Sequence, residues 1–402
     1  MSVSKIKTIF LASVALFLAI TLISYPKVAL KASVEGLHTW WEIVFPSLLP
    51  FFIIAELLIG FGVVKFIGVL LEPFMKPIFR VPGVGGFVWA MAMASGNPAG
   101  AKFTVRLRKE GQISKIEAER LVAFTSCANP LFIFGAVSVG FFKNAHLGIL
   151  LALSHYLANI FVGIMMRFYG NDEVVMEERA RFSIREAFDA MHQTRINDKR
   201  PIGKLLGDAV TSSVQTLLMI GGFIILFSVI NALLAHIDIT DFLAKGVQIL
   251  LHLAFLPQNF SIPFIYGLFE MTIGSKLISE VNHATLLDKA IAVSFLLAFG
   301  GFSIQAQVAS LLANSDIRFG PFFIARLVQG IFASILTIFL WNPVYESTNE
   351  KHYFILPVFH PAIGETTYSC FRFFSEIGPV ITICTLIIYI FIYIKREFKP
   401  GS

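Results

Sequence analysis

The sequence predicts an all-α polytopic membrane protein made of inverted repeats, with two re-entrant helical hairpins and two broken helices. Of its 402 residues, 56% are hydrophobic and only 14% are charged, which is more apolar surface than a soluble fold of this length can bury. Apolar stretches long enough to cross roughly 30 Å of hydrocarbon, about 20 residues each, recur along nearly the whole chain. The chain therefore folds in lipid.

Eight apolar segments are long enough to be crossings, and two further apolar segments are interrupted near their middles. The crossings are expected at residues 8–25, 38–62, 117–142, 147–168, 208–235, 288–313, 320–341 and 378–394. Gly, Pro and polar residues interrupt the segments 84–103 and 260–281. We expect these two segments to be hairpins that enter and leave the membrane on the same side.

Lysine and arginine residues test this number of crossings. They gather near the N-terminus, in the connecting segments 65–80, 102–120 and 170–205, and after the last crossing. Eight crossings and two hairpins put all these groups on one side, which the positive-inside rule makes cytoplasmic, with both chain ends there. The segment 343–376 falls on the opposite side. Because topology accounts for the formal charge of +6, no nucleic-acid partner is indicated.

The same order of elements occurs twice, in residues 37–170 and in residues 205–342. In each, an amphipathic stretch precedes a hairpin, and a broken span and a plain span follow it. The predicted topology opens the first hairpin to the cytoplasm and the second to the far side, which is the inverted repeat of secondary transporters. Residues 1–36 form an N-terminal span and connector, residues 171–204 a cytoplasmic linker, and residues 343–402 an extracytoplasmic loop, a last span and a cytoplasmic tail.

The interruption of the first hairpin predicts a polar cavity. A backbone break at membrane depth persists only where protein or a polar cavity satisfies it. A half-helix that restarts at Pro98 leaves free N–H groups and a positive dipole end, which favour an anion. The substrate-binding residues expected here are Ser95, Gly96, Asn97 and Gly100, with Lys102 in coupling or gating. The alternative is a plain kink for helix packing, because Gly and Ser also allow close helix contacts.

The span after the first hairpin is broken at Asn129-Pro130. Proline removes a backbone hydrogen bond, and the amide of Asn129 is then expected to point toward the same region as the first hairpin break. Ser126 and Asn129 therefore join the expected binding residues. A kink whose polar groups are satisfied by the protein is the alternative reading.

The second hairpin carries a carboxylate, Glu270, in an apolar setting. An acidic residue at the centre of a membrane helix costs about 2.5 to 3.5 kcal/mol on insertion scales, so we expect a coupling or gating role. Four uses stay open for Glu270: an ion pair with Lys276, binding of a coupling cation, carriage of a proton, and a hydrogen bond to the opposing broken helix. The binding residues expected in this half are Thr272, Ser275, Ser303, Gln305 and Gln307. Because Gln305 and Gln307 are two apart, they point in different directions unless Gly300-Gly301 unwinds the helix.

Other signals favour structural roles. His38, Trp40 and Trp41 are expected at a membrane interface as an aromatic belt, and His155 is expected to bond a neighbouring helix. The chain contains no H-E-x-x-H, G-x-S-x-G or P-loop motif, and its three cysteines show no C-x-x-C spacing. We therefore expect no enzymatic activity, no cofactor and no metal site.

Several of these segments resemble a known family. The stretches 40–52, 80–86, 95–102 and 129–133 together closely resemble the YlbJ-type sporulation integral membrane proteins, also called stage V sporulation protein V, and the similarity runs over nearly the entire chain. The segments around Glu270 and Gly300-Gly301 resemble those of the wider nucleoside-recognition (Gate) family. That family is similar in layout to concentrative nucleoside transporters.

The resemblance implies a transporter that moves dipicolinic acid, or a similar small organic anion, out of the mother cell across the outer forespore membrane. Half-helix N-termini and Lys102 would suit the two carboxylates of dipicolinate, whereas Glu270 would repel them unless it is protonated or cation-bound. Two alternatives stay open: a nucleoside or nucleobase carrier of the same architecture, and a non-transporting scaffold that acts through residues 171–204. The lipid bilayer, a coupling cation or proton, and a second copy of the chain are the other expected partners.

Overall fold

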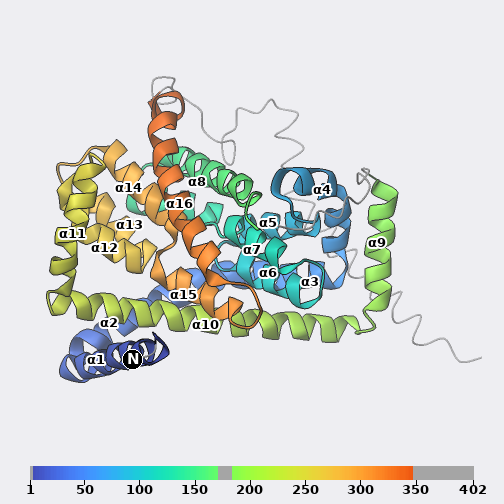
Figure 1. Ribbon diagram of the computed structural model, residues 1–402, viewed down its shortest axis with the longest axis horizontal. Helices are drawn as coiled ribbons and strands as arrows, with labels where there is room; N and C mark the ends of the chain where they lie inside the picture. Colours follow the sequence, from blue (N-terminus) through green and yellow to red (C-terminus); the bar gives the residue numbers. More distant parts are fainter. Residues whose placement is uncertain (1–2, 171–182, 347–402) are drawn as a thin grey trace, which may run out of the picture. The chain divides into compact units, whose positions relative to one another are not determined.

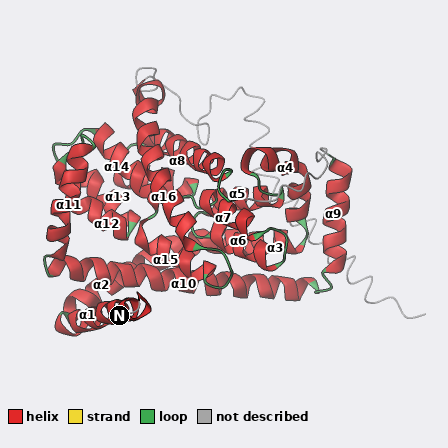
Figure 2. Cartoon of the chain, in the orientation of Figure 1, coloured by secondary structure: helices red, strands yellow, loops and turns green. Residues whose placement is uncertain are grey.

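The computed structural model describes residues 3–170 and 183–346, and in these residues it contains helices and no strand (Figures 1 and 2). The predicted all-α class is therefore confirmed for this part of the chain. The predicted last crossing, 378–394, and the cytoplasmic tail lie outside the described residues. The same is true of Cys370 and Cys384, and of the first part of the linker, residues 171–182.

The described helices follow one another with short connections. In the first half they are α1 (Val3–Ser24), α2 (Pro26–Thr39), the π-helical turn η1 (Trp40–Val44), α3 (Phe45–Gly60), α4 (Val63–Phe79), α5 (Val84–Ser95), α6 (Ala99–Lys109), α7 (Lys115–Phe124), η2 (Leu131–Phe141) and α8 (Ala145–Met166). The second half contains α9 (Ile184–Asn197), α10 (Ile202–His236), α11 (Ile239–Leu253), η3 (Gln258–Phe260), α12 (Ser261–Phe269), α13 (Met271–Glu280), α14 (Leu286–Phe299), α15 (Gly301–Leu312), α16 (Phe319–Leu340) and η4 (Trp341–Glu346).

The predicted order of elements occurs in both halves. The short helices α5 and α6 form the first interrupted hairpin, and α12 and α13 form the second. Each pair is followed by a broken helix, α7 with η2 and α14 with α15, and then by the 22-residue helices α8 and α16. Local signals place several starts: Ser114 and Glu117 form a capping box before α7, as Thr285 and Asp288 do before α14.

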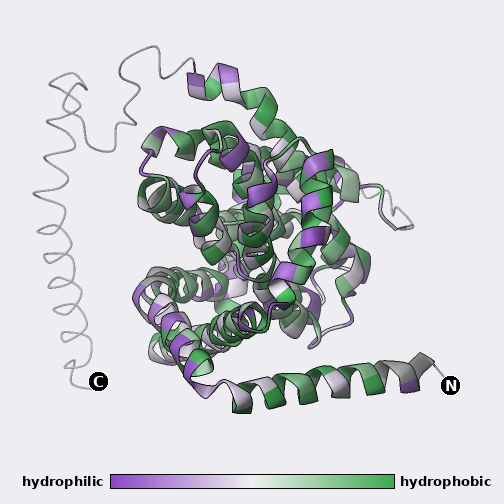
Figure 3. Cartoon of the chain, turned by 90° about the vertical axis from the view of Figure 1, so that its left-hand side faces the viewer, coloured by the Kyte–Doolittle hydropathy of each residue, from purple (hydrophilic) through white to green (hydrophobic). Residues whose placement is uncertain are grey.

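Four helical segments of the described chain are long and apolar enough to cross a membrane: α8, α10, α14 with α15, and α16 with η4. The number rises to six if the bent pairs α1–α2 and α3–α4 each count as one span. Large apolar side chains are exposed along the described helices, among them Phe10, Ile23, Leu253 and Phe339. Figure 3 shows hydrophobic residues, in green, along most of the helices. Such surfaces are expected where a protein contacts lipid.

The second predicted crossing differs from the observed helix. The sequence predicts a start at residue 38, but α2 begins at Pro26 and continues through η1 into α3. This path follows α10, because a Cβ atom on Gly36 would lie 2.9 Å from Ser228 and one on Gly60 would lie 2.6 Å from Leu205. The residues expected to form a connector after the first span are therefore partly a packed helix.

The predicted interfacial role of Trp40 is wrong. Its side chain is only 6% exposed, and its indole N–H donates to the carbonyl of Leu217 in the middle of α10, at 2.9 Å. Gly221 lies against the same ring. Trp40 therefore fastens the π-helical turn η1 to α10 inside the protein, while its neighbour Trp41 is exposed.

The amphipathic helices α4 and α11 lie at opposite ends of α10 (Figure 1). α4 packs against α9, which precedes α10, whereas α11 follows directly after it. The 35 residues of α10 span about 50 Å, which exceeds the thickness of the hydrocarbon core. This placement agrees with two interfacial helices on opposite membrane faces. The inverted insertion of the two hairpins itself stays a prediction.

Candidate functional site

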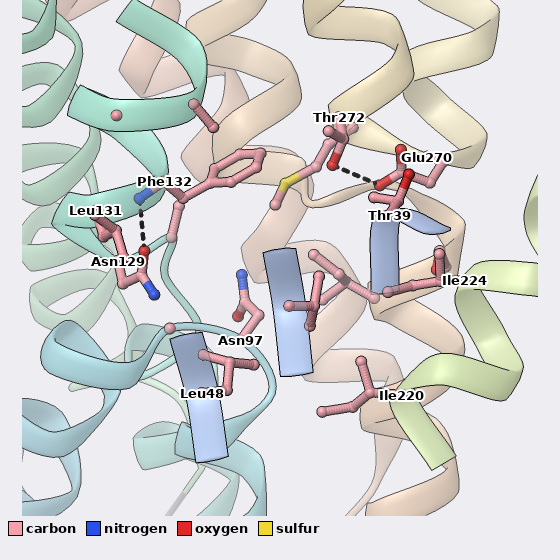
Figure 4. Close-up of a pocket in the computed structure, with 18 of the residues that line it drawn as sticks. Thr39, Leu48, Asn97, Asn129, Leu131, Phe132, Ile220, Ile224, Glu270 and Thr272 are labelled. Carbon is pink, nitrogen blue, oxygen red and sulfur yellow. Dashed lines mark hydrogen bonds between the residues drawn. The ribbon is translucent and has the colours of Figure 1, made fainter. Parts of the chain in front are cut away.

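A cavity of about 740 Å³ lies where the interruptions of the two halves meet. Its walls are mostly apolar and include Leu131, Phe132, Ile220 and Ile224 (Figure 4). Most of the polar lining comes from both hairpin breaks and both broken helices, and Thr39 at the end of α2 and Glu42 in η1 add to it. The lining includes eight of the residues expected from the sequence: Ser95, Gly96, Asn97, Asn129, Glu270, Thr272, Ser303 and Gln307. A mainly apolar cavity with a few convergent polar groups is the usual form of a small-molecule site.

Asn129 joins the first hairpin to the first broken helix. Its amide nitrogen donates to the carbonyl of Ser95 at 3.1 Å, and its amide oxygen accepts from the backbone N–H of Phe132 at 2.7 Å. The first bond satisfies an unpaired carbonyl at the end of α5, and the second caps the start of η2. Next to this joint, the hydroxyl of Ser126 donates to the amide oxygen of Asn97. The two breaks of the first half therefore form one connected polar wall.

Glu270 occupies the interruption between α12 and α13 and is 9% exposed. Its carboxylate accepts from the hydroxyl of Thr272 at 3.0 Å and from the backbone N–H of Ile273 at 2.9 Å. Among the described residues it has no ion-pair partner, so the predicted pair with Lys276 does not form. Glu270 and Thr272 face the cavity from the side opposite Asn97 and Asn129 (Figure 4).

The four half-helices that begin at the cavity are capped in two ways. Glu270 caps α13 and Asn129 caps η2. In contrast, no side chain caps the start of α6, after Asn97-Pro98, or the start of α15, after the left-handed residue Gly300 at φ 82°. The positive ends of these two helix dipoles therefore lie beside Asn97 in one wall and Ser303 in the other. Both starts suit the negative groups of a ligand.

The remaining predicted binding residues lie behind the walls of the cavity. Gln305 donates to the carbonyl of Phe299 at 2.8 Å, while Gln307 lines the cavity, so the two glutamines point in different directions. Ser275 is fully buried within α13. A Cβ atom on Gly100 would lie 2.1 Å from the carbonyl oxygen of Thr125, so Gly100 lets α6 approach the end of α7 closely. Gly100 therefore allows close helix packing, which is the alternative that the sequence left open for this interruption.

Lys102 is not brought to the cavity. Its ammonium lies 3.0 Å from the carboxylate of Glu56 on α3, and the same carboxylate binds Arg106 on α6 and accepts from Ser212 on α10 at 3.1 Å. Ser212 precedes the lining residue Ile220 by eight positions, about 12 Å along α10. The charge of Lys102 is therefore paired with Glu56 in a buried cluster that ties three helices together.

Two polar residues behind the cavity bear on its shape. His155 on α8 accepts from the backbone N–H of Ala128 at 3.0 Å, which agrees with the bond to a neighbouring helix expected for it. Arg326 on α16 is 1% exposed and was not singled out from the sequence. The rule that drew attention to Glu270, a charge within an apolar span, applies equally to Arg326 and would have found it.

No group of three or more His, Cys, Asp or Glu side chains that could hold a metal ion occurs in the part of the chain that the structure describes. The chemistry available around the cavity is that of amide, hydroxyl and carboxylate side chains with helix ends. These groups can bind and release a polar solute.

Replacing Asn129 by Ala is expected to weaken ligand binding about tenfold and to destabilise the protein by about 2 kcal/mol, because a buried backbone carbonyl and a partly buried backbone N–H lose their partner. Asn129→Asp keeps the cap on Phe132 but removes the donor to Ser95, so it separates the two bonds. Thermal midpoints and ligand titrations of the purified variants measure both effects. The exposed Asn314→Ala, which removes a bond on the surface, is the control. Wild-type affinity in Asn129→Ala would contradict this role.

Two interrupted hairpins, two broken helices and a shared cavity among apolar spans define a transporter-like integral membrane protein. Comparison with known sequences agrees: the nucleoside-recognition (Gate) family matches residues 41–145 and 217–315, and each range holds one hairpin and one broken helix. The sporulation integral membrane protein YlbJ of Bacillus subtilis (strain 168) is 56% identical over 401 residues, which cover 98% of either chain. The chain belongs to the nucleoside-recognition family and, within it, to the YlbJ-type sporulation integral membrane proteins.

Among solved structures, the chain is similar to a doubly substituted CNTnw in an outward-facing state. The match covers 80% of this chain and 86% of that chain, with 12% sequence identity and a TM-score of 0.37.

Proposed function

We propose that this protein is a membrane carrier for a small organic anion, with dipicolinate as the expected substrate, moved out of the mother cell across the outer forespore membrane. The observation that supports this proposal best is the cavity of about 740 Å³ whose lining includes polar groups from all four helix interruptions. A site built from helix breaks in two repeats can change its access when one repeat moves against the other. The name of the sporulation relative supports the cellular setting.

The groups around the cavity suit an anion with two separated carboxylates. The starts of α6 and α15, which no side chain caps, bring the positive ends of two helix dipoles to opposite walls. Gln307 lines the second wall and adds an amide near Ser303. Two carboxylates line the cavity: Glu42, which lies 2.9 Å from His38, and Glu270, which has no ion-pair partner among the described residues. The charge of Glu270 opposes a dianion, so the carrier must neutralise that charge with a proton or a cation during binding. This requirement would couple dipicolinate movement to a second ion.

In the predicted topology both chain ends lie in the cytoplasm, and the cavity extends toward the far side of the membrane. Its lining continues from Asn129 to Gly140 and Phe141 at the end of η2, which that topology places extracytoplasmically. The cluster of Glu56, Lys102 and Arg106 lies toward the other end, where basic residues gather. In this topology the cavity opens to the side on which the proposed exporter releases its substrate.

A nucleoside or nucleobase carrier is the second candidate. One observation favours it: Glu270 and Thr272 form a hydrogen-bonded pair that faces the cavity and could bind the hydroxyl groups of a sugar without charge repulsion. The name of the matching family points the same way. A scaffold that acts through residues 171–204 is a third candidate, and it predicts that variants of Asn129 or Glu270 have no effect on spore dipicolinate while deletion of that segment does.

Titration of the purified protein separates these candidates. We expect saturable binding of dipicolinate and flux of dipicolinate into proteoliposomes, with no competition by uridine or adenosine. Isophthalate, which has the same two carboxylates but no ring nitrogen, controls for general anion binding and should compete weakly. Binding of a nucleoside without binding of dipicolinate would replace the first proposal by the second, and binding of neither would leave the scaffold.

A further inference from the structure

Arg326 is a buried cation to which the described part of the chain offers no carboxylate partner. It lies seven residues from the start of α16, about 10 Å along the helix axis, in a segment apolar enough to cross a membrane. Its side chain is 1% exposed. Among the described residues its guanidinium donates only to two backbone carbonyls, and its Nε atom has no partner. An uncompensated charge at this depth is costly and is rarely present without a function.

Both carbonyls belong to the end of the half-helix α7. One Nη atom of Arg326 donates to the carbonyl of Ala123 and the other to the carbonyl of Ser126. The carbonyl of Ala123 is one of the last four of α7, where the negative end of the helix dipole also favours a cation. The carbonyl of Ser126 follows in the interruption and also accepts from Asn159, at 3.5 Å. The planar guanidinium can reach both at once, which an ammonium group cannot do with the same fixed geometry. Arg326, which belongs to the second half of the chain, therefore holds the interruption between α7 and η2 in the first half.

The residues that Arg326 fixes lead directly to the cavity. Ser126, whose carbonyl it binds, donates its hydroxyl to Asn97, and Asn97 lines the cavity. Two residues further on, Ala128 is bound from behind by His155 and Tyr156, at 3.0 Å each. Side chains of α8 and α16 therefore hold the segment 125–130 on the side away from the cavity, and the other side of this segment forms part of the cavity wall. If these contacts were lost, the residues that line the cavity would move.

The charge of Arg326 also contributes to the balance of positive and negative charge around the cavity. The carboxylate of Glu270 lies in one wall, and the guanidinium lies behind the opposite wall, next to the interruption that carries Asn129. A second lining carboxylate, Glu42, has His38 as its partner. Lys102 and Arg106 are paired with Glu56 and do not reach the cavity. Arg326 is therefore the described cation placed to attract an anionic group to this wall, through the low-dielectric interior.

We propose that Arg326 is a positioning and charge-selecting residue of the transport site. It holds the segment 125–130 in the shape that lines the cavity, and it supplies the fixed positive charge that favours an anion over a neutral ligand. The second part of this inference rests on the proposed function, whereas the first part does not.

Three variants test both parts in the full-length protein: Arg326→Lys keeps the charge, Arg326→Met removes charge and donors, and Arg195→Met is the matched control. Arg195 is exposed and lies in the last turn of α9, a helix that packs against α4. Hydrogen–deuterium exchange of residues 121–133 without ligand reports the positioning role. We expect about tenfold faster exchange in both Arg326 variants and no change in Arg195→Met.

The charge role is measured by titration with dipicolinate and with its neutral analogue pyridine-2,6-dicarboxamide. We expect Arg326→Met to weaken dipicolinate binding about tenfold and the diamide less than about threefold, while Arg326→Lys keeps the wild-type ratio of the two affinities. A hydrogen–deuterium exchange rate in Arg326→Lys equal to that of the wild type would overturn the positioning role. If Arg326→Met does not fold, Arg326→Lys alone tests this role. Equal losses for both ligands would overturn the charge role. If the wild type binds neither ligand, the proposed function fails, and the exchange experiment still decides the positioning role.

Discussion

Glu270→Gln is expected to abolish ion-driven transport, with a loss of at least about tenfold in dipicolinate flux under an applied proton or cation gradient. The substitution is nearly isosteric, and the remaining amide oxygen can still accept from the N–H of Ile273 that Glu270 now binds at 2.9 Å. The start of α13 therefore stays capped, and the main change is the loss of a charge that a coupling ion neutralises. Flux in proteoliposomes with and without the gradient measures the effect.

The sign of the binding change in Glu270→Gln separates the two candidate substrates. A dianion should bind about threefold or more tightly in the absence of a coupling ion, because a repelling charge is gone. A nucleoside should bind more weakly, because an amide oxygen is a poorer acceptor for hydroxyl groups than a carboxylate. Glu280→Gln, an exposed position at the end of the same helix, controls for general effects. Wild-type coupling and affinity in Glu270→Gln would mean that the carboxylate serves only as a helix cap.

Gly100→Ala is expected to destabilise the protein by about 3 kcal/mol and to eliminate ligand binding. A Cβ atom at this position would lie 2.1 Å from the carbonyl oxygen and 2.7 Å from the carbonyl carbon of Thr125. Because both partners are backbone, relief requires that α6 move away from the end of α7. That movement separates Asn97 from Ser126 and opens the polar wall of the cavity.

Thermal unfolding in detergent, followed by size-exclusion chromatography, measures the loss in Gly100→Ala. The matched control is Gly222→Ala on α10, where a Cβ atom would meet nothing within 4 Å. Alanine favours a helix over glycine by about 1 kcal/mol, so this control should be as stable as the wild type or more stable. Equal stability of Gly100→Ala and the wild type would show that the contact between α6 and α7 is not as close as the structure has it.

The sequence was sufficient to predict the helical class, the repeated order of elements and the four interruptions. Lipid imposes apolar runs of about 20 residues, and a broken backbone within such a run is visible as Gly, Pro and polar residues at one place. For that reason the amino-acid pattern alone indicates Asn97, Asn129 and Glu270 as site residues, and the structure places all three at one cavity. Their detailed roles in transport stay predictions.

Tertiary structure alone decided where each charged and polar side chain points. The sequence specifies where Lys102, Arg326 and Trp40 each stand in their own helices. Their partners Glu56, Ser126 and Leu217 lie on segments distant in sequence. The packing of those helices turns Lys102 away from the cavity, brings Arg326 behind it and buries Trp40. Lipid specifies which residues must be apolar, whereas contacts between helices decide which polar groups meet, because every buried donor and acceptor must find its partner within the protein.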